Sequence, residues 1–79
     1  MEVLGMTVDE MTPVVQQYID QAFRSGLPSV TIVHGHGTGT LRQAVRHLLK
    51  DNPVVLRYEG GMDYEGGSGV TVVHFKQTS

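Results

Sequence analysis

A run of histidines, glycines and threonines at residues 34–42 carries the side chains best suited to chemistry in this chain of 79 residues. It reads His-Gly-His-Gly-Thr-Gly-Thr-Leu-Arg, and glycines at alternate positions let the main chain approach a ligand closely. Backbone N–H groups where a strand gives way to a helix bind anions, helped by the helix dipole. Thr38 or Thr40 can cap that helix. We therefore predict a phosphate-binding loop rather than a merely flexible helix start, made of Gly35, His36, Gly37, Thr38, Gly39 and Arg42.

The kind of phosphate ligand follows from what surrounds the loop. A Walker A lysine and the Gly-x-Gly-x-x-Gly spacing of dinucleotide folds are both absent, so free nucleotides are poor ligands. Basic side chains at i, i+4 and i+8 extend from the loop along one face of the predicted second helix: Arg42, Arg46 and Lys50. The net charge of −2 argues against nucleic acid, but half of the six Lys and Arg residues lie in this stripe. The stripe indicates a phosphodiester track, with an ordinary solvated helix face as the alternative.

Two residues are candidates for catalysis. His34 ends the predicted second strand, and an imidazole that titrates near neutrality suits proton transfer or a hydrogen bond to phosphate. His36 is a further candidate for the tasks of His34, which are proton transfer and a hydrogen bond to phosphate. Glu2 would approach the loop if the first two strands are parallel neighbours, and it would then position water or a divalent cation; an exposed residue near a frayed terminus is the alternative. We expect no tightly bound cofactor, with Mg²⁺ or Mn²⁺ serving cleavage only.

Hydrophobic periodicity indicates the elements that position these residues. Thr7 and Glu10 have the spacing of a capping box, and the apolar face that follows continues to about Arg24. Pro13 implies either a kink or a regular helix that begins with Thr12 as its cap. A second amphipathic helix follows the glycine loop. Runs rich in β-branched residues predict strands at residues 1–4, 29–33, 54–58 and 70–75.

This order, βαβαββ, predicts an α/β two-layer sandwich. Two right-handed crossovers place both helices on one face of a four-stranded mixed sheet and leave the other face open. Residues 1–79 have room for a single domain that ends in a polar tail at residues 76–79. The absence of cysteine excludes disulfides and thiolate zinc sites. No apolar run is long enough for a signal peptide or a membrane span, so we expect a cytoplasmic protein without a membrane partner.

Three blocks of the sequence resemble the small MutS-related (Smr) domain family. The histidine-glycine motif with Leu41-Arg42 is similar to its central signature, residues 66–73 resemble its C-terminal loop and strand, and Gly5 closes its N-terminal block. The resemblance covers essentially the whole chain. Residues 7–75 look most similar to the C-terminal domain of the recombination-suppressing bacterial MutS paralogues. This similarity implies a fragment of a larger, dimerising ATPase in the bacterial cytosol.

The resemblance also implies a fold and an activity. The family fold is a βαβαββ sandwich, similar to the C-terminal domain of bacterial translation initiation factor 3 and to DNase-I-like halves. The family activity is nicking or cleavage of DNA or RNA, often with a divalent cation, in recombination and repair, and some members engage stalled ribosomes. By the resemblance, the central site falls on His34, Gly35, Gly37, Gly39 and Arg42.

The N-terminal block departs from the family pattern. Members usually read Leu-Asp-Leu-His/Arg-Gly, whereas this chain reads Met-Glu-Val-Leu-Gly. Glu2 keeps the negative charge one methylene further out, but Leu4 can neither donate a hydrogen bond nor stabilise a phosphate. Two hypotheses result. The first is an endonuclease domain acting on branched or structured DNA or on RNA, and the second is a non-catalytic module that docks a MutS-like ATPase on DNA or the ribosome.

Overall fold

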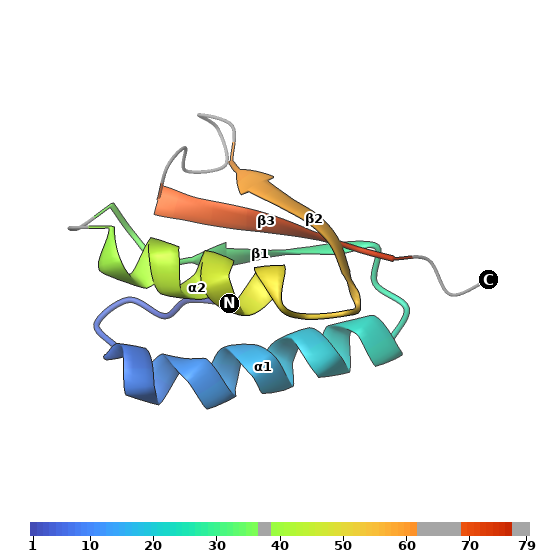
Figure 1. Cartoon of the computed structure of the whole chain (residues 1–79), viewed down its shortest axis with the longest axis horizontal. Helices are drawn as coiled ribbons and strands as arrows, with labels where there is room; N and C mark the ends of the chain where they lie inside the picture. Colours follow the sequence, from blue (N-terminus) through green and yellow to red (C-terminus); the bar gives the residue numbers. More distant parts are fainter. Residues whose placement is uncertain (37–38, 62–68, 77–79) are drawn as a thin grey trace.

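The computed structural model describes residues 1–36, 39–61 and 69–76, and in it two helices pack against a three-stranded sheet (Figure 1). The predicted α/β class is confirmed, and both predicted helices are present. None of the described helices is long and apolar enough to cross a membrane. The elements are α1 (Val8–Arg24), β1 (Ser29–Val33), α2 (Thr40–Lys50), β2 (Val55–Gly60) and β3 (Val70–Phe75).

Helix α1 begins where its capping box predicts. The Thr7 hydroxyl accepts the Glu10 N–H, and the Glu10 carboxylate accepts the Thr7 N–H, each at 3.1 Å. These bonds satisfy two backbone donors that no helical carbonyl reaches. Pro13 lies inside the helix on an exposed face, so the alternative start at Thr12 is wrong. The helix runs as one ribbon to Arg24 (Figure 1).

Strand β3 lies between β1 and β2 and is antiparallel to both. Val30 is opposite Val73 on one side, and Tyr58 is opposite Val73 on the other. Strand β2 extends to Gly60, beyond the predicted end of its strand, so Glu59 belongs to the sheet and not to a loop. The predicted mixed sheet is therefore not confirmed, because the three described strands form an antiparallel sheet.

The predicted first strand is reduced to one isolated bridge. Glu2 pairs with Val33 in parallel, as expected for a neighbour of β1, through two backbone hydrogen bonds of 2.8 Å on Val33. The segment does not continue as a strand because Gly5, with φ of 80°, turns the chain toward α1. The predicted fourth strand is thus not confirmed, although the chain still lies along the edge of β1.

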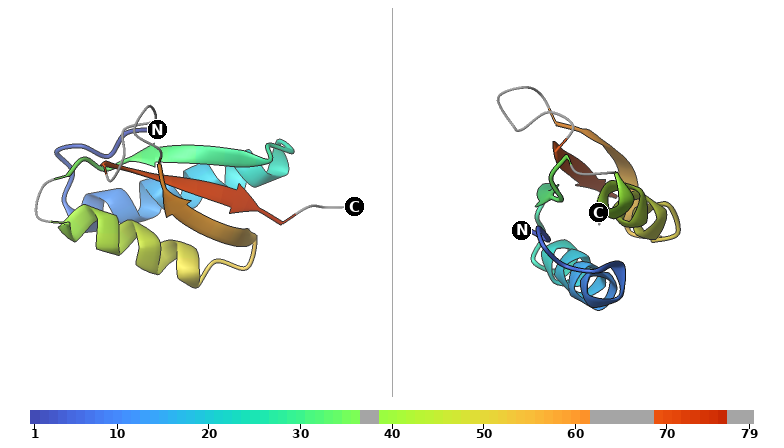
Figure 2. Two further views of the ribbon diagram at one scale, coloured as in Figure 1. Left: turned by 90° about the horizontal axis from the view of Figure 1, so that it is seen from above. Right: turned by 90° about the vertical axis from the view of Figure 1, so that its left-hand side faces the viewer.

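The core lies between the sheet and the two helices. Val30 and Ile32 of β1 and Val73 and Phe75 of β3 face it, because alternate strand residues share a face. Figure 2 shows both helices next to each other on this side of the sheet, as predicted. The helices contribute buried residues from the predicted apolar faces: Met11, Val15, Ile19 and Ala22 from α1, and Val45 and Leu49 from α2.

We predict that Thr7→Ala lowers the free energy of unfolding by about 1 kcal/mol, because it removes the cap of α1. Urea unfolding at neutral pH measures this loss. The matched control is Thr12→Ala, whose hydroxyl bonds a carbonyl within the helix, so its removal leaves stability nearly unchanged. An equal loss in both variants would contradict the capping account.

The same capping box makes the free energy of unfolding depend on pH. The Thr7 backbone N–H, and after it the Thr7 side chain, lower the pKa of the Glu10 carboxyl below its ordinary value. A carboxyl with a lowered pKa in the folded state stabilises the fold at neutral pH and loses this contribution as the pH falls through the lowered pKa. The stability gap between the unchanged chain and Glu10→Ala should therefore narrow in acid.

Candidate nucleic-acid interface

The predicted phosphate loop begins where the end of β1 is hydrogen-bonded to the start of β3. The N–H groups of His34 and Gly35 both donate to the Gly69 carbonyl, at 3.1 and 2.8 Å. Gly35 then takes a φ of 76°, which turns the chain out of the sheet and which side-chain-bearing residues rarely adopt. The predicted loop residues Gly37 and Thr38 lie outside the described part of the chain.

The loop ends at an N-terminus of α2 whose N-cap residue is a glycine. Gly39 is the N-cap, with φ of 85°, and it makes no side-chain cap hydrogen bond. Thr40 is the first helical residue, so its predicted role as the cap is wrong. The first turn also contains no acidic residue. The donors of this turn and the positive end of the helix dipole are therefore suited to an external anion.

A small pocket of about 150 Å³ lies at this N-terminus. Pockets for whole small molecules have volumes from about 300 Å³, so this one suits a phosphate group rather than a complete nucleotide. Most of the predicted binding residues that the structure describes meet here. The lining consists of His34, Gly35, His36, Gly39, Thr40, Leu41 and Arg42.

His34 is built into the wall of the pocket. Its side chain is buried, with the residue 4% exposed, and both ring nitrogens have partners. Nδ1 lies 2.9 Å from the Gly35 carbonyl, and Nε2 lies 2.8 Å from the Thr71 hydroxyl. A carbonyl only accepts, so in the neutral ring Nδ1 carries the proton and Nε2 accepts from Thr71. His34 thus holds the loop to β3, and its catalytic role stays a prediction.

His36 is the histidine whose ring is open to a ligand. The ring lies against Gly69, where an added Cβ would stand only 3.0 Å from Cε1, so the missing side chain makes room for the imidazole. Among the described residues the ring of His36 has no hydrogen-bond partner. His34 is buried by the sheet and His36 is exposed. This difference arises from the folded sheet, so the sequence gives little indication of which histidine is open to a ligand.

The candidate carboxylate lies apart from His34. Val3 is fully buried on the helix side, so its neighbour Glu2 points to the opposite face of the sheet and is exposed. His34 instead bonds Thr71, which stands opposite the core residue Ile32. The two predicted catalytic side chains therefore extend from opposite faces, and the structure does not bring them together.

Leu4 occupies the place next to the loop where the family pattern has a basic residue. Its Cδ2 atom lies 2.6 Å from the position that a Cβ on Gly35 would take, so Leu4 covers this glycine. Its side chain is nonetheless largely exposed. An apolar group thus lies against Gly35, one of the residues that line the pocket, and the arginine of the lining, Arg42, comes from α2.

The three basic residues of α2 differ in their surroundings. Arg42 lines the pocket and Lys50 is exposed. Arg46 reaches across to the end of β2, where its Nη2 lies 3.7 Å from the position of a Cβ on Gly60. Its Nε atom is buried and has no hydrogen-bond partner among the described residues. Arg42 and Lys50 are therefore the freer phosphate contacts, with Arg46 held between them against the sheet.

The described residues do not assemble a site for a divalent cation. Within residues 1–36, 39–61 and 69–76 no three histidine or carboxylate side chains gather as ligands. Glu2, the predicted metal contact, therefore belongs to no such group among the described residues. These residues alone therefore do not fit a protein-held Mg²⁺ or Mn²⁺.

The fold and the glycine loop are those of the Smr domain. The family model of that description matches residues 1–76, and the chain belongs to this family. It is 49% identical over 72 residues to the Endonuclease MutS2 of Thermomicrobium roseum, and 50% identical over 72 residues to that of Clostridium botulinum strain 657. Each alignment covers 91% of this chain but 9% of the relative, so the chain spans about a tenth of the length of these curated relatives.

Solved structures agree with this membership. The Smr domain of Thermus thermophilus MutS2 superposes with a TM-score of 0.92 at 38% identity, covering 96% of this chain and 95% of that one. YdaL, a stand-alone small MutS-related protein from Escherichia coli, gives a TM-score of 0.92 at 29% identity, covering 98% of this chain and 63% of that one. The three-stranded architecture therefore matches solved members of the family.

We predict that Thr71→Val lowers the free energy of unfolding by about 1–3 kcal/mol, because it leaves Nε2 of His34 buried without a partner. Valine keeps the shape of threonine, so packing does not account for this loss. Thr71→Ser is the control, since it keeps the hydroxyl and removes only a methyl group. Urea unfolding of the three chains measures the effect. A valine variant as stable as the unchanged chain would contradict the anchoring role of His34.

Proposed function

We propose that this domain holds the phosphodiester backbone of DNA or RNA in the pocket at the N-terminus of α2 and nicks the strand there. The observation that carries the proposal is the N-terminus of α2, with glycine as its N-cap and no acidic residue in its first turn, which opens on a pocket of phosphate size beside Arg42 and His36. Backbone donors and a guanidinium are the groups that proteins use for phosphate oxygens.

Charge distribution supports a polymer as the ligand. Within the described residues Arg42, Arg46 and Lys50 have no carboxylate partner, whereas the first turn of α1 is acidic. Positive charge is thus concentrated along α2 despite the overall charge of −2. A track of about three phosphates would release counterions on binding and give a slope of log affinity against log salt near −2 to −3.

Support for cleavage comes from the relatives, which are named endonucleases. Hydrolysis of a phosphodiester adds water to phosphorus and breaks one P–O bond. The N–H groups of α2 and Arg42 would stabilise the charge that develops on the phosphoryl oxygens. His36 has a ring free to move a proton, whereas both ring nitrogens of His34 are occupied. We therefore assign proton transfer to His36 and loop positioning to His34.

A second candidate is a docking module that binds nucleic acid without cutting it. Two observations favour it. Glu2 and His34 extend from opposite faces of the sheet, and Leu4 covers Gly35 where a basic side chain would contact phosphate. In this version the pocket and Arg42 bind as before, but no carboxylate activates water.

The relatives are about ten times longer than this chain, so the domain would act as part of a larger protein. We extend the proposal to that setting. A dimeric MutS-like ATPase would carry the domain to branched DNA, where nicking would suppress recombination or serve repair, or to RNA on a stalled ribosome.

The test is a nicking assay on supercoiled plasmid and on structured RNA, with Mg²⁺ or Mn²⁺ present. We expect a nicked product that falls by about 10²–10⁴-fold in His36→Ala. Arg42→Ala should weaken both binding and cleavage, and it should flatten the salt slope by about one unit. Arg24→Ala, which removes a cation already paired with Asp20 on α1, is the matched control and should change neither.

The outcomes separate the two candidates. Binding that depends on Arg42, with no product on either substrate, would establish the docking module. Nicking that persists in His36→Ala but vanishes in Glu2→Ala would transfer the catalytic role to the carboxylate. Binding that is unchanged in Arg42→Ala would overturn the pocket itself.

A further inference from the structure

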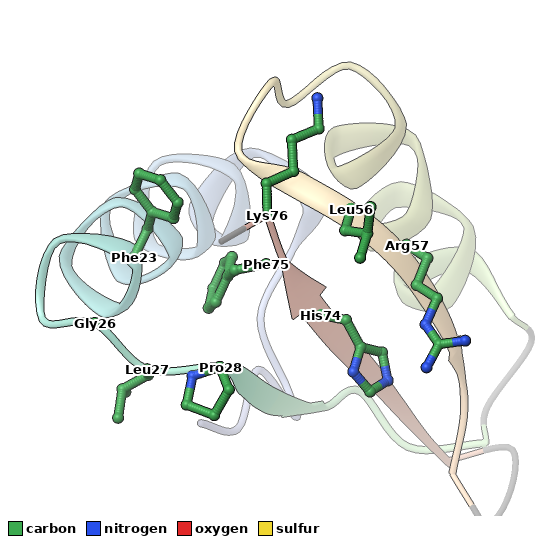
Figure 3. Close-up of a pocket in the computed structure, with 9 residues that line it drawn as sticks. All are labelled: Phe23, Gly26, Leu27, Pro28, Leu56, Arg57, His74, Phe75 and Lys76. Atoms are coloured by element: carbon green, nitrogen blue, oxygen red, sulfur yellow. The ribbon is translucent and has the colours of Figure 1, made fainter. Parts of the chain in front are cut away.

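A groove lies at the opposite end of the sheet from the phosphate pocket. The pocket follows the end of β1, whereas the groove starts at Leu27 and Pro28, just before β1 begins. Its volume of about 790 Å³ is several times that of the pocket. Figure 3 shows the turn between α1 and β1 on one side, Leu56 and Arg57 of β2 on the other, and His74, Phe75 and Lys76 between them.

Two aliphatic side chains stand exposed on the two sides of this groove. Leu56 is 61% exposed and Leu27 is 47% exposed. Leu56 is the extra residue of a β-bulge, because Val55 pairs with Phe75 while Arg57 pairs with the preceding His74. Leu56 thus stands between Val55, which faces the core, and Arg57, and its own side chain points to water. Water-exposed leucines on the two sides of a groove provide apolar surface for an apolar group of a ligand.

The charge of the groove has one sign. Its ionisable lining residues are Arg57, His74 and Lys76, with no aspartate or glutamate among the lining residues. His74 has a partner in Glu59, at 2.9 Å. Arg57 and Lys76 have no carboxylate partner within the part of the chain that the structure describes. The groove is therefore complementary to a ligand that carries negative charge beside an apolar group.

The neighbouring backbone suits an extended chain. Strand β2 pairs only with β3 in the described sheet, so it is an edge strand whose outer side offers main-chain donors and acceptors. Leu56 and Arg57 belong to this edge strand and line the groove. A peptide lying along such an edge gains main-chain hydrogen bonds while its side chains enter adjacent pockets.

We propose that this groove binds an extended polypeptide segment of a partner protein, in which an apolar side chain is flanked by carboxylates. The apolar side chain lies between Leu27 and Leu56, and the carboxylates meet Arg57 and Lys76. A nucleic-acid strand fits less well, because nucleobases stack on exposed aromatic faces. Of the two phenylalanines that line the groove, Phe75 is only 5% exposed and Phe23 is half-buried, packed edge-to-face against Phe75. The proposal is independent of the phosphate pocket.

The test uses a fluorescein-labelled peptide of sequence EELFDEE and fluorescence anisotropy with the complete 79-residue chain. We expect saturable binding that weakens at least about five-fold when the peptide phenylalanine becomes alanine, or when its acids become lysines. Leu56→Ser and the double variant Arg57→Glu, Lys76→Glu should each weaken binding by a similar factor. Excess unlabelled single-stranded DNA should not displace the peptide.

The matched controls are Val14→Ser, an exposed apolar residue on α1, and Lys50→Glu, a cation outside the groove. Both should bind like the unchanged chain, and thermal unfolding verifies that all variants fold. Equal affinity for the acidic and lysine peptides, or unchanged affinity in both groove variants, would overturn the proposal. Displacement by single-stranded DNA would assign the groove to nucleic acid and overturn it equally.

Discussion

The rest of this site depends on the hydrogen bonds that join the end of β1 to the start of β3. One carbonyl, that of Gly69, accepts the N–H groups of both His34 and Gly35. The buried ring of His34 joins the same two segments through Thr71, at 2.8 Å. Buried polar groups tolerate little displacement, because a broken bond leaves a donor or acceptor without a partner. The point where the chain leaves the sheet is therefore fixed.

This fixed point determines where α2 begins and which groups face the pocket. Gly35 turns the chain out of the sheet and Gly39 ends the loop, both with positive φ. The N-terminus of α2 then lies beside His36, and the first turn of α2 contains no acidic side chain. The two histidines of the motif thereby acquire different roles. His34 supports the loop from within the sheet, and His36 remains open to a ligand.

Much of the fold could be predicted from local patterns. The capping box at Thr7 predicts the start of α1, and the β-branched run at residues 70–75 predicts β3. Both predictions are correct because they depend on interactions between residues close in the sequence. The strand predicted at residues 1–4 is reduced to a single bridge, because only two backbone hydrogen bonds to Val33 form before Gly5 turns the chain. Strand length depends on that tertiary turn, which periodicity does not show.

The site was predictable in its residues but not in its geometry. Glycine spacing identified the loop, and the structure gathers its described members around one pocket. Glu2 and His34 point in opposite directions because side chains alternate between the two faces of the sheet. Predicting this needs the register in which the segment of Glu2 pairs with β1, and the sequence does not give that register. The β-bulge at Leu56 has no sequence signal of its own.

The central claim is that the N-terminus of α2 binds a phosphodiester through its charge. The most direct measurement is a titration of the ¹⁵N-labelled chain with a thymidine dinucleotide, followed by amide chemical shifts. The account predicts saturable shifts at Gly39, Leu41 and Arg42, and their loss with the methylphosphonate dinucleotide, which lacks the negative charge. Equal shifts with both dinucleotides, or shifts confined to other parts of the chain, would contradict it.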